Sequence, residues 1–294
     1  MNIEMMSIEE KKDITRRIYV EYPRFGNILQ EIGKCHKSYR YNLDPDCLVI
    51  YGKSGVGKST LFKRYATNYP REVKKGNTYV PVLYITIPVP ATHHTMVKKL
   101  LSTMGDPIVE RGSTANKTLR LYKYLRDCKT QLIILDELHN FIDKDYYHTV
   151  LQNVRDWLKV LLIDTGIPMV VMGLNEAQKI IDTDPQISRR FLRRITLEPF
   201  TLKNESGQKE FISFLSALDS LLPLTKRSFL WADEMPQRIL AATEGIVGFI
   251  TALIRYTVEL ALDRGYDKLE LELLAETFDN YEIGVSKREN PFMV

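Results

Sequence analysis

The sequence has few cysteines and no long apolar run. Cys35, Cys47 and Cys128 are the three cysteines of 294 residues and have no paired spacing, which excludes a disulfide framework and a zinc knuckle. The longest nearly uncharged stretch, 78–98, is broken by prolines and histidines, and the first residues show no charged segment followed by an apolar one. We therefore expect neither a membrane span nor a secretory signal, and we expect a cytoplasmic protein.

The chain also has little net charge. It carries 41 basic and 37 acidic residues, for a formal charge of +4, which is too small to indicate a nucleic-acid-binding protein by itself. The charge is unevenly placed, since Lys/Arg residues crowd 53–75 while 259–282 is strongly acidic. This asymmetry is compatible with an anionic partner but does not identify one.

Short apolar segments alternate with helical patterns in the middle of the chain. The segments are CLVIYG (47–52), YVPVLYITI (79–87), QLIILDE (131–137), IPMVVMG (167–173) and RITLEPF (194–200). Strands separated by helices predict an α/β fold with a parallel five-stranded sheet sandwiched by helices. We expect a helical leader (1–45), this α/β domain (46–200), a small all-α lid (201–283) and a flexible C-terminal tail (284–294).

A phosphate-binding loop follows the first predicted strand. Residues 52–59 match G-x-x-x-x-G-K-[ST] and lead into a helical segment, as the motif requires. Its glycines let consecutive backbone N–H groups face phosphates, its lysine reaches the β and γ phosphates, and its serine can ligate Mg²⁺. The predicted ATP-binding residues are Gly52, Lys53, Ser54, Gly55, Val56, Gly57, Lys58, Ser59 and Thr60.

Polar residues follow two later strands at the same predicted edge. Asp136 and Glu137 end QLIILDE; together with Ser59, Asp136 can hold Mg²⁺, and Glu137 can deprotonate the attacking water. Asn175 follows the fourth strand and can hold that water, or it can instead cap the next helix. We expect ATP hydrolysis, with ATP preferred to GTP because no N-K-x-D-like guanine-reading segment is present.

Four arginines lie in DPQISRRFLRRITLEPF (184–200). The segment begins with a turn and re-enters the sheet at an edge, away from the chain's own phosphate loop. Arg190, or else Arg189, suits the γ-phosphate bound by a neighbouring subunit, because a guanidinium supplied in trans neutralises charge in the transition state. Arg193 and Arg194 lie closer to the strand and could instead bind DNA or an acidic surface.

The order of these segments resembles the AAA+ ATPases, and more narrowly the transposition regulators of the TniB/TnsC type. The matching pieces are YGKSGVGKST, LIILDELHN, VVMGLNEA, DPQISRRF and ATEGIVGFITALI, and the resemblance covers roughly residues 20–283. It implies an ATP-dependent homo-oligomer, a head-to-tail filament or ring, on double-stranded DNA. It also implies two protein partners, a transposase and a target-selection protein of the TniQ/TnsD kind.

The resemblance assigns further roles by position. Lys58 and Ser59 would bind nucleotide and Mg²⁺, and Asp136 and Glu137 would form the Walker B pair. Asn175 would stand at sensor 1, and Arg190 would be the arginine finger, the residue that reaches the ATP of the neighbouring subunit. One departure is that TEGIVGFITALIR has no basic residue before Arg255, where many AAA+ proteins place a sensor 2 arginine. Closure of the lid on ATP would then depend on packing contacts and not on a direct contact between a lid arginine and a phosphate.

The resemblance also implies DNA contacts from the loop after the second strand and from the segment before the next helix. The small donors and cations there suit phosphate oxygens, although a solvated polar loop explains each of them equally well. They are Thr92, His93, His94, Lys98, Lys99, Arg111, Ser113, Thr114 and Lys117. No third ligand is spaced to join His93 and His94 in a metal site.

Other classes of protein share the ATP motifs. A helicase loader or replication initiator is the main alternative, although an initiator should continue into a winged-helix domain. A secretion ATPase would bring a membrane-binding segment, and a small-molecule kinase would need an acceptor pocket. A nucleotide-held scaffold would bind ATP at the same residues and hardly hydrolyse it.

Overall fold

The computed structural model describes residues 3–41, 45–141, 147–182, 184–284 and 289–293. The chain divides into two compact units. The sheet unit comprises Asn27–Ser54 and Lys58–Leu197, and the helical unit comprises Met1–Gly26, Gly55–Gly57 and Glu198–Val294. The predicted leader of residues 1–45 is thus not a separate part, because its first half belongs to the helical unit and its second half to the sheet unit.

The sheet unit is built on five parallel strands. In spatial order they are β4 (Val82–Thr86), β5 (Leu132–Asp136), β6 (Met169–Gly173), β1 (Leu48–Tyr51) and β7 (Arg193–Thr196). Residues of β1, β5 and β6 are buried throughout, as expected of strands covered on both faces. The predicted five-stranded parallel sheet is confirmed.

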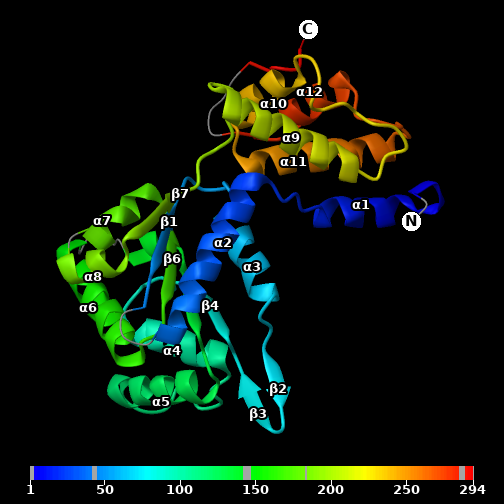
Figure 1. Ribbon diagram of the computed structural model, residues 1–294. Helices are drawn as coiled ribbons and strands as arrows, with labels where there is room; N and C mark the ends of the chain where they lie inside the picture. The colour runs from blue at the N-terminus through cyan, green and yellow to red at the C-terminus, as the bar shows by residue number, and fades with distance from the viewer. Residues whose placement is uncertain (1–2, 42–44, 142–146, 183, 285–288, 294) are drawn as a thin grey trace. The chain divides into compact units, whose positions relative to one another are not determined.

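Helices cover both faces of this sheet (Figure 1). Alternate strand residues such as Val49, Ile133 and Val171 join one core with side chains of the helices that follow β4, β5 and β6, because successive strand residues face opposite sides. These helices are α4 (His93–Met104), α5 (Thr114–Asp127), α6 (Tyr147–Thr165), α7 (Gln178–Asp182) and α8 (Pro185–Arg190). The other face is covered by α3 (Lys58–Thr67) and α2 (Pro23–Lys37), and the 3-10 turn η2 (Ser38–Tyr41) follows α2.

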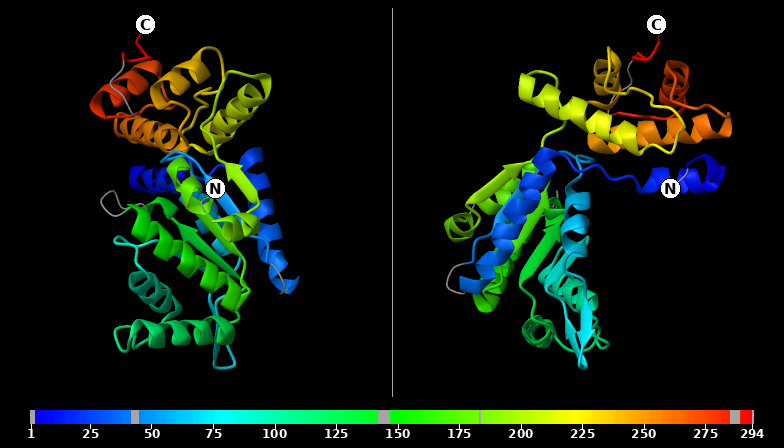
Figure 2. Two further views of the ribbon diagram at one scale, coloured as in Figure 1. Left: turned by 90° about the vertical axis from the view of Figure 1, so that its left-hand side faces the viewer. Right: turned by 45° about the vertical axis from the view of Figure 1, so that its right-hand side comes forward.

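A β-hairpin that the sequence interpretation missed follows α3. It pairs β2 (Glu72–Lys74) with β3 (Asn77–Tyr79) and projects from the rest of the sheet unit (Figure 2). Lys75 and Gly76 form its turn at φ 50° and 78°, the left-handed pair that favours a two-residue hairpin. The predicted strand 79–87 is therefore wrong at its start, where Pro81 separates β3 from β4.

The helical unit contains four consecutive helices at its C-terminal side. They are α9 (Glu205–Leu221), α10 (Met235–Thr243), α11 (Val247–Asp263) and α12 (Leu271–Asn280), and all four lie within residues 201–283, where the sequence predicts an all-α segment. No single described helix is long and apolar enough to cross a membrane, and α10 and α11 reach that length together only across a bend of 113°.

Near the N-terminus, the 3-10 turn η1 (Ile3–Met5) precedes α1 (Ile8–Arg17). Ion pairs hold α1 along α11 in the helical unit, with Lys12 Nζ 2.6 Å from Asp263 Oδ1 and Arg16 Nε 3.1 Å from Glu259 Oε1. These pairs join α1 to the C-terminal half of α11 within the helical unit.

Residues 289–293 pack against the helices of the helical unit. Phe292 is 1% exposed and its ring meets that of Phe278 at 6.2 Å, edge to face. Asn290 Nδ2 donates to Ala275 O at 2.8 Å, and Arg238 Nη1 donates to Pro291 O at 2.9 Å. The prediction of a flexible tail is wrong for the described residues 289–293, because a buried aromatic ring and these bonds fix them.

Phe292→Ala should release this segment from the helical unit. A buried Phe reduced to Ala loses about 3–5 kcal/mol, and a chain end can detach without unfolding the helices beneath it. The Phe292 N–H, now 3.0 Å from Asn290 Oδ1, should then exchange with deuterium at the rate of an unstructured peptide. Met293→Ala is the matched control, since Met293 is 65% exposed; equal protection in both variants would show that the ring does not hold the tail.

Candidate nucleotide-binding site

The phosphate loop begins where β1 ends. Gly52 N donates to Gly173 O at 3.2 Å, which fixes the start of the loop to the end of β6. Lys58 begins α3, and its buried Nζ donates to Gly52 O and Lys53 O, both at 2.7 Å. Burial lowers the pKa of Lys58, and the charges of Glu137 and Asp136 oppose that shift. The ammonium thus lies folded over its own loop, on carbonyl groups that an anion can replace.

Ser59 and Asp136 meet beside this lysine. Ser59 Oγ donates to Asp136 Oδ2 at 2.7 Å, and Tyr84 OH donates to the same oxygen at 3.1 Å. The other oxygen, Oδ1, accepts from Glu137 N at 2.9 Å. A hydroxyl and a carboxylate converging at one point are hard oxygen donors of the kind that Mg²⁺ prefers, so the residues present fit this ion.

Glu137 follows Asp136 with a left-handed backbone, at φ 62°. This conformation is uncommon for a residue with a side chain, and strain of this kind is often found at functional sites. Its carboxylate Oε2 lies 2.8 Å from His139 Nε2, and its carbonyl accepts from Asn140 N at 2.8 Å in the 3-10 turn η3 (Leu138–Phe141). The carboxylate of Glu137 is therefore held by the residue two positions on.

The end of β6 packs tightly against this turn. A Cβ added to Gly173 would lie 2.9 Å from Ala177 Cβ and 3.1 Å from Leu138 Cβ, so only glycine fits. Asn175 is exposed two residues later and begins the 3-10 turn η4 (Asn175–Ala177). Leu174 is the N-cap and makes no side-chain cap bond, so the alternative assignment of Asn175 as the helix cap is wrong.

The tip of the phosphate loop, Gly55–Gly57, belongs to the helical unit. Gly55 and Gly57 have φ 78° and 99°, and Gly55 O accepts from Gly248 N at 2.8 Å. A Cβ on Gly248 would lie 3.0 Å from that oxygen. The start of α11, where the sequence lacks a sensor 2 arginine, thus touches the loop tip by backbone.

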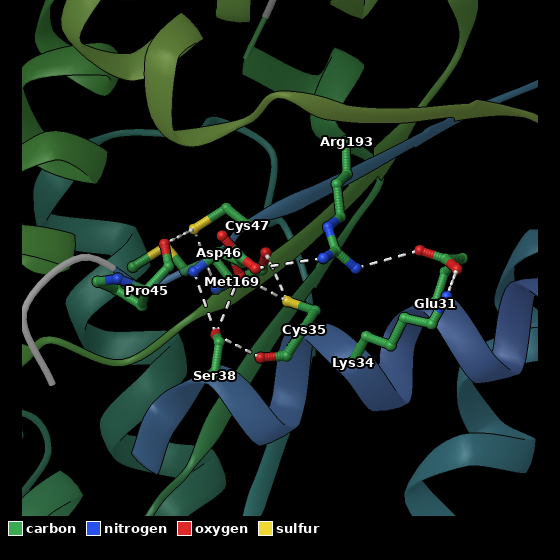
Figure 3. Close-up of polar contacts among 9 residues, drawn as sticks. All are labelled: Glu31, Lys34, Cys35, Ser38, Pro45, Asp46, Cys47, Met169 and Arg193. Carbon is green, nitrogen blue, oxygen red and sulfur yellow. Dashed lines mark hydrogen bonds and ion pairs between the residues drawn. The ribbon is translucent and has the colours of Figure 1, made fainter. Parts of the chain in front are cut away.

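Adjacent arginines of β7 face opposite sides of the sheet. Arg193 reaches Glu31 Oε2 at 3.2 Å and Asp46 Oδ2 at 3.3 Å (Figure 3). Arg194 faces the other side, where it pairs with Asp182 and donates to Ser188 Oγ at 2.9 Å. Both arginines are thus engaged by acids of their own unit, and binding of DNA or an outside acidic surface by them stays a prediction.

The finger candidates lie in the last turn of α8. Arg189 is exposed and Arg190 is half-buried. Arg190 O accepts from Cys47 N at 3.1 Å, which places α8 at the start of β1, whereas the phosphate loop follows the end of β1. Four strand residues at about 3.3 Å each separate these two levels by about 13 Å.

The predicted DNA contacts gather at the N-terminal ends of α4 and α5. His94 Nδ1 lies 2.9 Å from Thr114 Oγ1 and His93 Nε2 lies 3.2 Å from Thr118 Oγ1; burial lowers the pKa of His93. Side chains from these ends and from α6 line a cavity of about 640 Å³. The lining residues are Ala91, Thr92, His93, His94, Thr114, Thr118, Tyr122, Asp156, Trp157 and Val160.

The other candidates differ in accessibility. Thr92 and Ser113 are the N-caps of α4 and α5, and Lys98 Nζ lies 2.6 Å from Glu110 Oε2. Lys99 and Arg111 are exposed. Lys117 is 2% exposed, so its ammonium is not presented to a ligand at the surface, and this burial argues against a DNA contact from Lys117.

Sequence reasoning missed two residues of the site. Tyr84 reaches Asp136 because β4 pairs with β5 in register, and no spacing in the sequence reveals that pairing. His139 had a visible signal, since it stands two residues after Glu137 in LDELHN and a titratable side chain beside an acidic pair is a candidate partner.

Comparison with known proteins gives a family and a fold. The model of the family "Bacterial TniB protein" matches residues 11–202. An ORC1-type DNA replication protein of Pyrococcus furiosus is 24% identical over 147 residues, which are 47% of this chain and 34% of that protein. The chain thus spans about a third of the length of this curated relative.

Solved structures of similar fold include Cdc6p of Pyrobaculum aerophilum, with a TM-score of 0.68 and 18% identity over 94% of this chain and 72% of that one. The Aeropyrum pernix ORC2 protein, in ADPNP–ADP complexes, has a TM-score of 0.64 and 17% identity over 91% and 70%. At these identities the likeness shows the fold alone, which is that of the AAA+ ATPases.

Gly173→Ala should destabilise the sheet unit by about 1–3 kcal/mol, the usual cost of forcing extra atoms into a packed site. The matched control is Gly33→Ala in α2, where nothing lies within 4 Å of the added Cβ. That change should stabilise by about 0.5–1 kcal/mol, because glycine weakens a helix interior. Urea unfolding measures both; shifts of the same sign would contradict the close packing at the end of β6.

Proposed function

The chain belongs to the family of bacterial TniB proteins, and from that premise we propose that it is an ATP-hydrolysing, DNA-binding regulator of transposition. The observation that carries this proposal is the meeting of Ser59 Oγ and Asp136 Oδ2 at 2.7 Å, next to Lys58 and Glu137. These are the donors that an ATPase needs at one edge of a parallel sheet.

Each group has a defined part in hydrolysis. Lys58 would exchange its two carbonyl contacts for the β and γ phosphates. Ser59 and Asp136 would hold Mg²⁺, which would supply positive charge to offset that of the phosphates. Glu137 leaves His139 to orient and deprotonate the attacking water, with Asn175 assisting at the end of β6. The residues at positions 52–60 surround the nucleotide.

The geometry also favours a shared active site. The last turn of α8, which carries Arg190, lies at the amino ends of the strands and Lys58 lies at their carboxyl ends. About 13 Å along the sheet separates Arg190 from its own phosphate loop. We propose that it, or Arg189, acts on ATP bound by the next copy in a head-to-tail filament or ring. Such heterologous contacts repeat along an assembly.

The DNA face is proposed at the N-terminal ends of α4 and α5. His94 and Thr114 join these ends, and both helix dipoles place partial positive charge there, which favours phosphate. Exposed Lys99 and Arg111 add full charges nearby. Double-stranded DNA would bind through its backbone, with little preference for sequence.

Family resemblance supplies the remaining elements of the proposal. The assembled protein would recruit a transposase and link it to a target-selection protein of the TniQ/TnsD kind, and hydrolysis would disassemble it. A replication-initiator role is the second candidate, favoured by the 24% identity to an ORC1-type protein. An initiator would prefer particular DNA sequences, which provides a test.

Lys58→Ala and Glu137→Gln should separate nucleotide binding from turnover. Lys58→Ala removes two charge-assisted bonds to phosphate, each about 1.5–3 kcal/mol, so ATP affinity should fall at least about 100-fold. Glu137→Gln keeps the shape of the side chain but cannot accept a proton, so turnover should fall about 10²- to 10⁴-fold with affinity retained. Equilibrium binding and steady-state phosphate release measure these effects.

Glu137→Gln should also leave the protein assembled on DNA for longer. Wild-type turnover by this variant would show that another group is the base. Unchanged ATP affinity of Lys58→Ala would show that the nucleotide binds elsewhere.

DNA binding should require ATP and weaken steeply with salt. Each neutralised phosphate contributes about 0.9 to the log–log salt slope, so Lys99→Ala and Arg111→Ala should each lower the slope per subunit by about that amount. Lys123→Ala, an exposed lysine further along α5, is the charge-matched control and should leave the slope unchanged. A shallow slope with strong preference for one sequence would favour the initiator role.

A further inference from the structure

Resting on the trans role proposed for the α8 arginines, we infer that Arg194 is a positioning residue that clamps α8 so that Arg190 or Arg189 reaches the neighbouring subunit's nucleotide. The clamp consists of Arg194, Asp182, Ser188 and the carbonyl of Phe191. All four belong to the sheet unit.

α8 needs such support because it is short. It has six residues, well below the roughly 12–15 at which an isolated helix becomes marginally stable. Its start is fixed by Asp184, whose Oδ1 accepts from Gln186 N at 2.7 Å and from Ile187 N at 3.2 Å. The last turn, which carries both finger candidates, is tied to the start of β1 by the bond from Cys47 N to Arg190 O at 3.1 Å, and its remaining side-chain support comes from β7.

Arg194 holds that last turn at several points with one planar group. Its Nη1 pairs with Asp182 at the end of α7, its Nη2 donates to Ser188 Oγ at 2.9 Å, and its Nε donates to Phe191 O at 3.2 Å. The guanidinium thus ties α7, the middle of α8 and the C-cap of α8 to strand β7. A lysine ammonium has no such fork of fixed donors and cannot replace it.

The clamp is also linked to the chain's own phosphate loop through the sheet. Arg194 stands opposite Val49 in the β1–β7 ladder, and β1 runs directly into Gly52. Tyr51, the last residue of β1, is buried and lies close enough to the Arg194–Asp182 pair for both charges to act on its pKa, which burial raises to about 12. The strand that leads into the phosphate loop is thus paired directly with the strand that carries Arg194.

A finger depends on accurate placement, since a displacement of about 1 Å can cost about 100-fold in rate. Arg194→Ala should therefore lower turnover about 10- to 100-fold while ATP affinity stays within about twofold. Arg194→Lys should fail similarly although it keeps the charge. Arg193→Ala is the matched control, because Arg193 is the adjacent residue and binds Glu31 and Asp46 on the opposite face; it should retain most turnover.

Mixing experiments distinguish positioning of the finger from general damage. Arg194→Ala subunits keep an intact phosphate loop, so mixing them with Lys58→Ala subunits, which keep an intact finger, should restore turnover in the presence of DNA. Mixing Arg194→Ala with Arg190→Ala should restore none, because neither donates a finger. Arg190→Ala mixed with Lys58→Ala should recover and reports on the trans finger alone.

Each outcome has one meaning. Recovery of the Arg190→Ala mixture without recovery of the Arg194→Ala mixture would show that Arg194 acts on its own site or fold, and would overturn the inference while leaving the proposed function intact. Wild-type turnover by Arg194→Ala would overturn it as well. If Arg190→Ala and Arg189→Ala both hydrolyse ATP normally, the proposal that an arginine of α8 acts in trans is wrong. The positioning role of Arg194, which rests on that proposal, is then wrong too.

Discussion

The parallel pairing of β1 with β6 and β7 is the constraint on which the candidate site depends. Leu48–Tyr51 pair with Val170–Gly173 on one side and with Arg193–Thr196 on the other. The ladder continues past the strand ends, where Gly52 N meets Gly173 O and Leu197 N meets Tyr51 O. Because parallel strands end at one edge, the phosphate loop, Asp136 and Asn175 emerge together and α8 lies at the other edge.

The polar groups at this edge are already paired with one another. Lys58 donates to backbone carbonyls, and Ser59 and Tyr84 donate to Asp136. The Glu137 carboxylate pairs with His139. A buried polar group without a partner is costly, and here Lys58, Ser59, Asp136 and Glu137 each have a partner that a ligand can replace. Nucleotide and Mg²⁺ would exchange these internal contacts for new ones, which keeps the site folded without them and ready to bind.

Because strand residues alternate between faces, the neighbouring arginines Arg193 and Arg194 contact different parts of the sheet unit. Arg193 and Arg194 occupy successive positions of an edge strand, so their side chains leave opposite faces of the sheet. One joins α2 to the residue before β1 through Glu31 and Asp46, and the other grips α7 and α8. The four arginines of 189–194 therefore fall into two pairs. Arg189 and Arg190 could face a neighbouring subunit, whereas Arg193 and Arg194 form ion pairs within the sheet unit.

The sequence by itself determined the features whose cause is local. Apolar runs, helix periodicity, the glycines of the phosphate loop and the acids after LIIL depend on residues close in the chain. The five strands, the all-α character of 201–283 and the residues of the candidate nucleotide site could therefore be predicted. Tertiary structure alone decided the docked Phe292, the burial of Lys117, the division of residues 1–45 between two units and the acids that engage Arg193 and Arg194. Each of these depends on contacts between segments distant in sequence, and local sequence patterns do not show which distant segments come into contact.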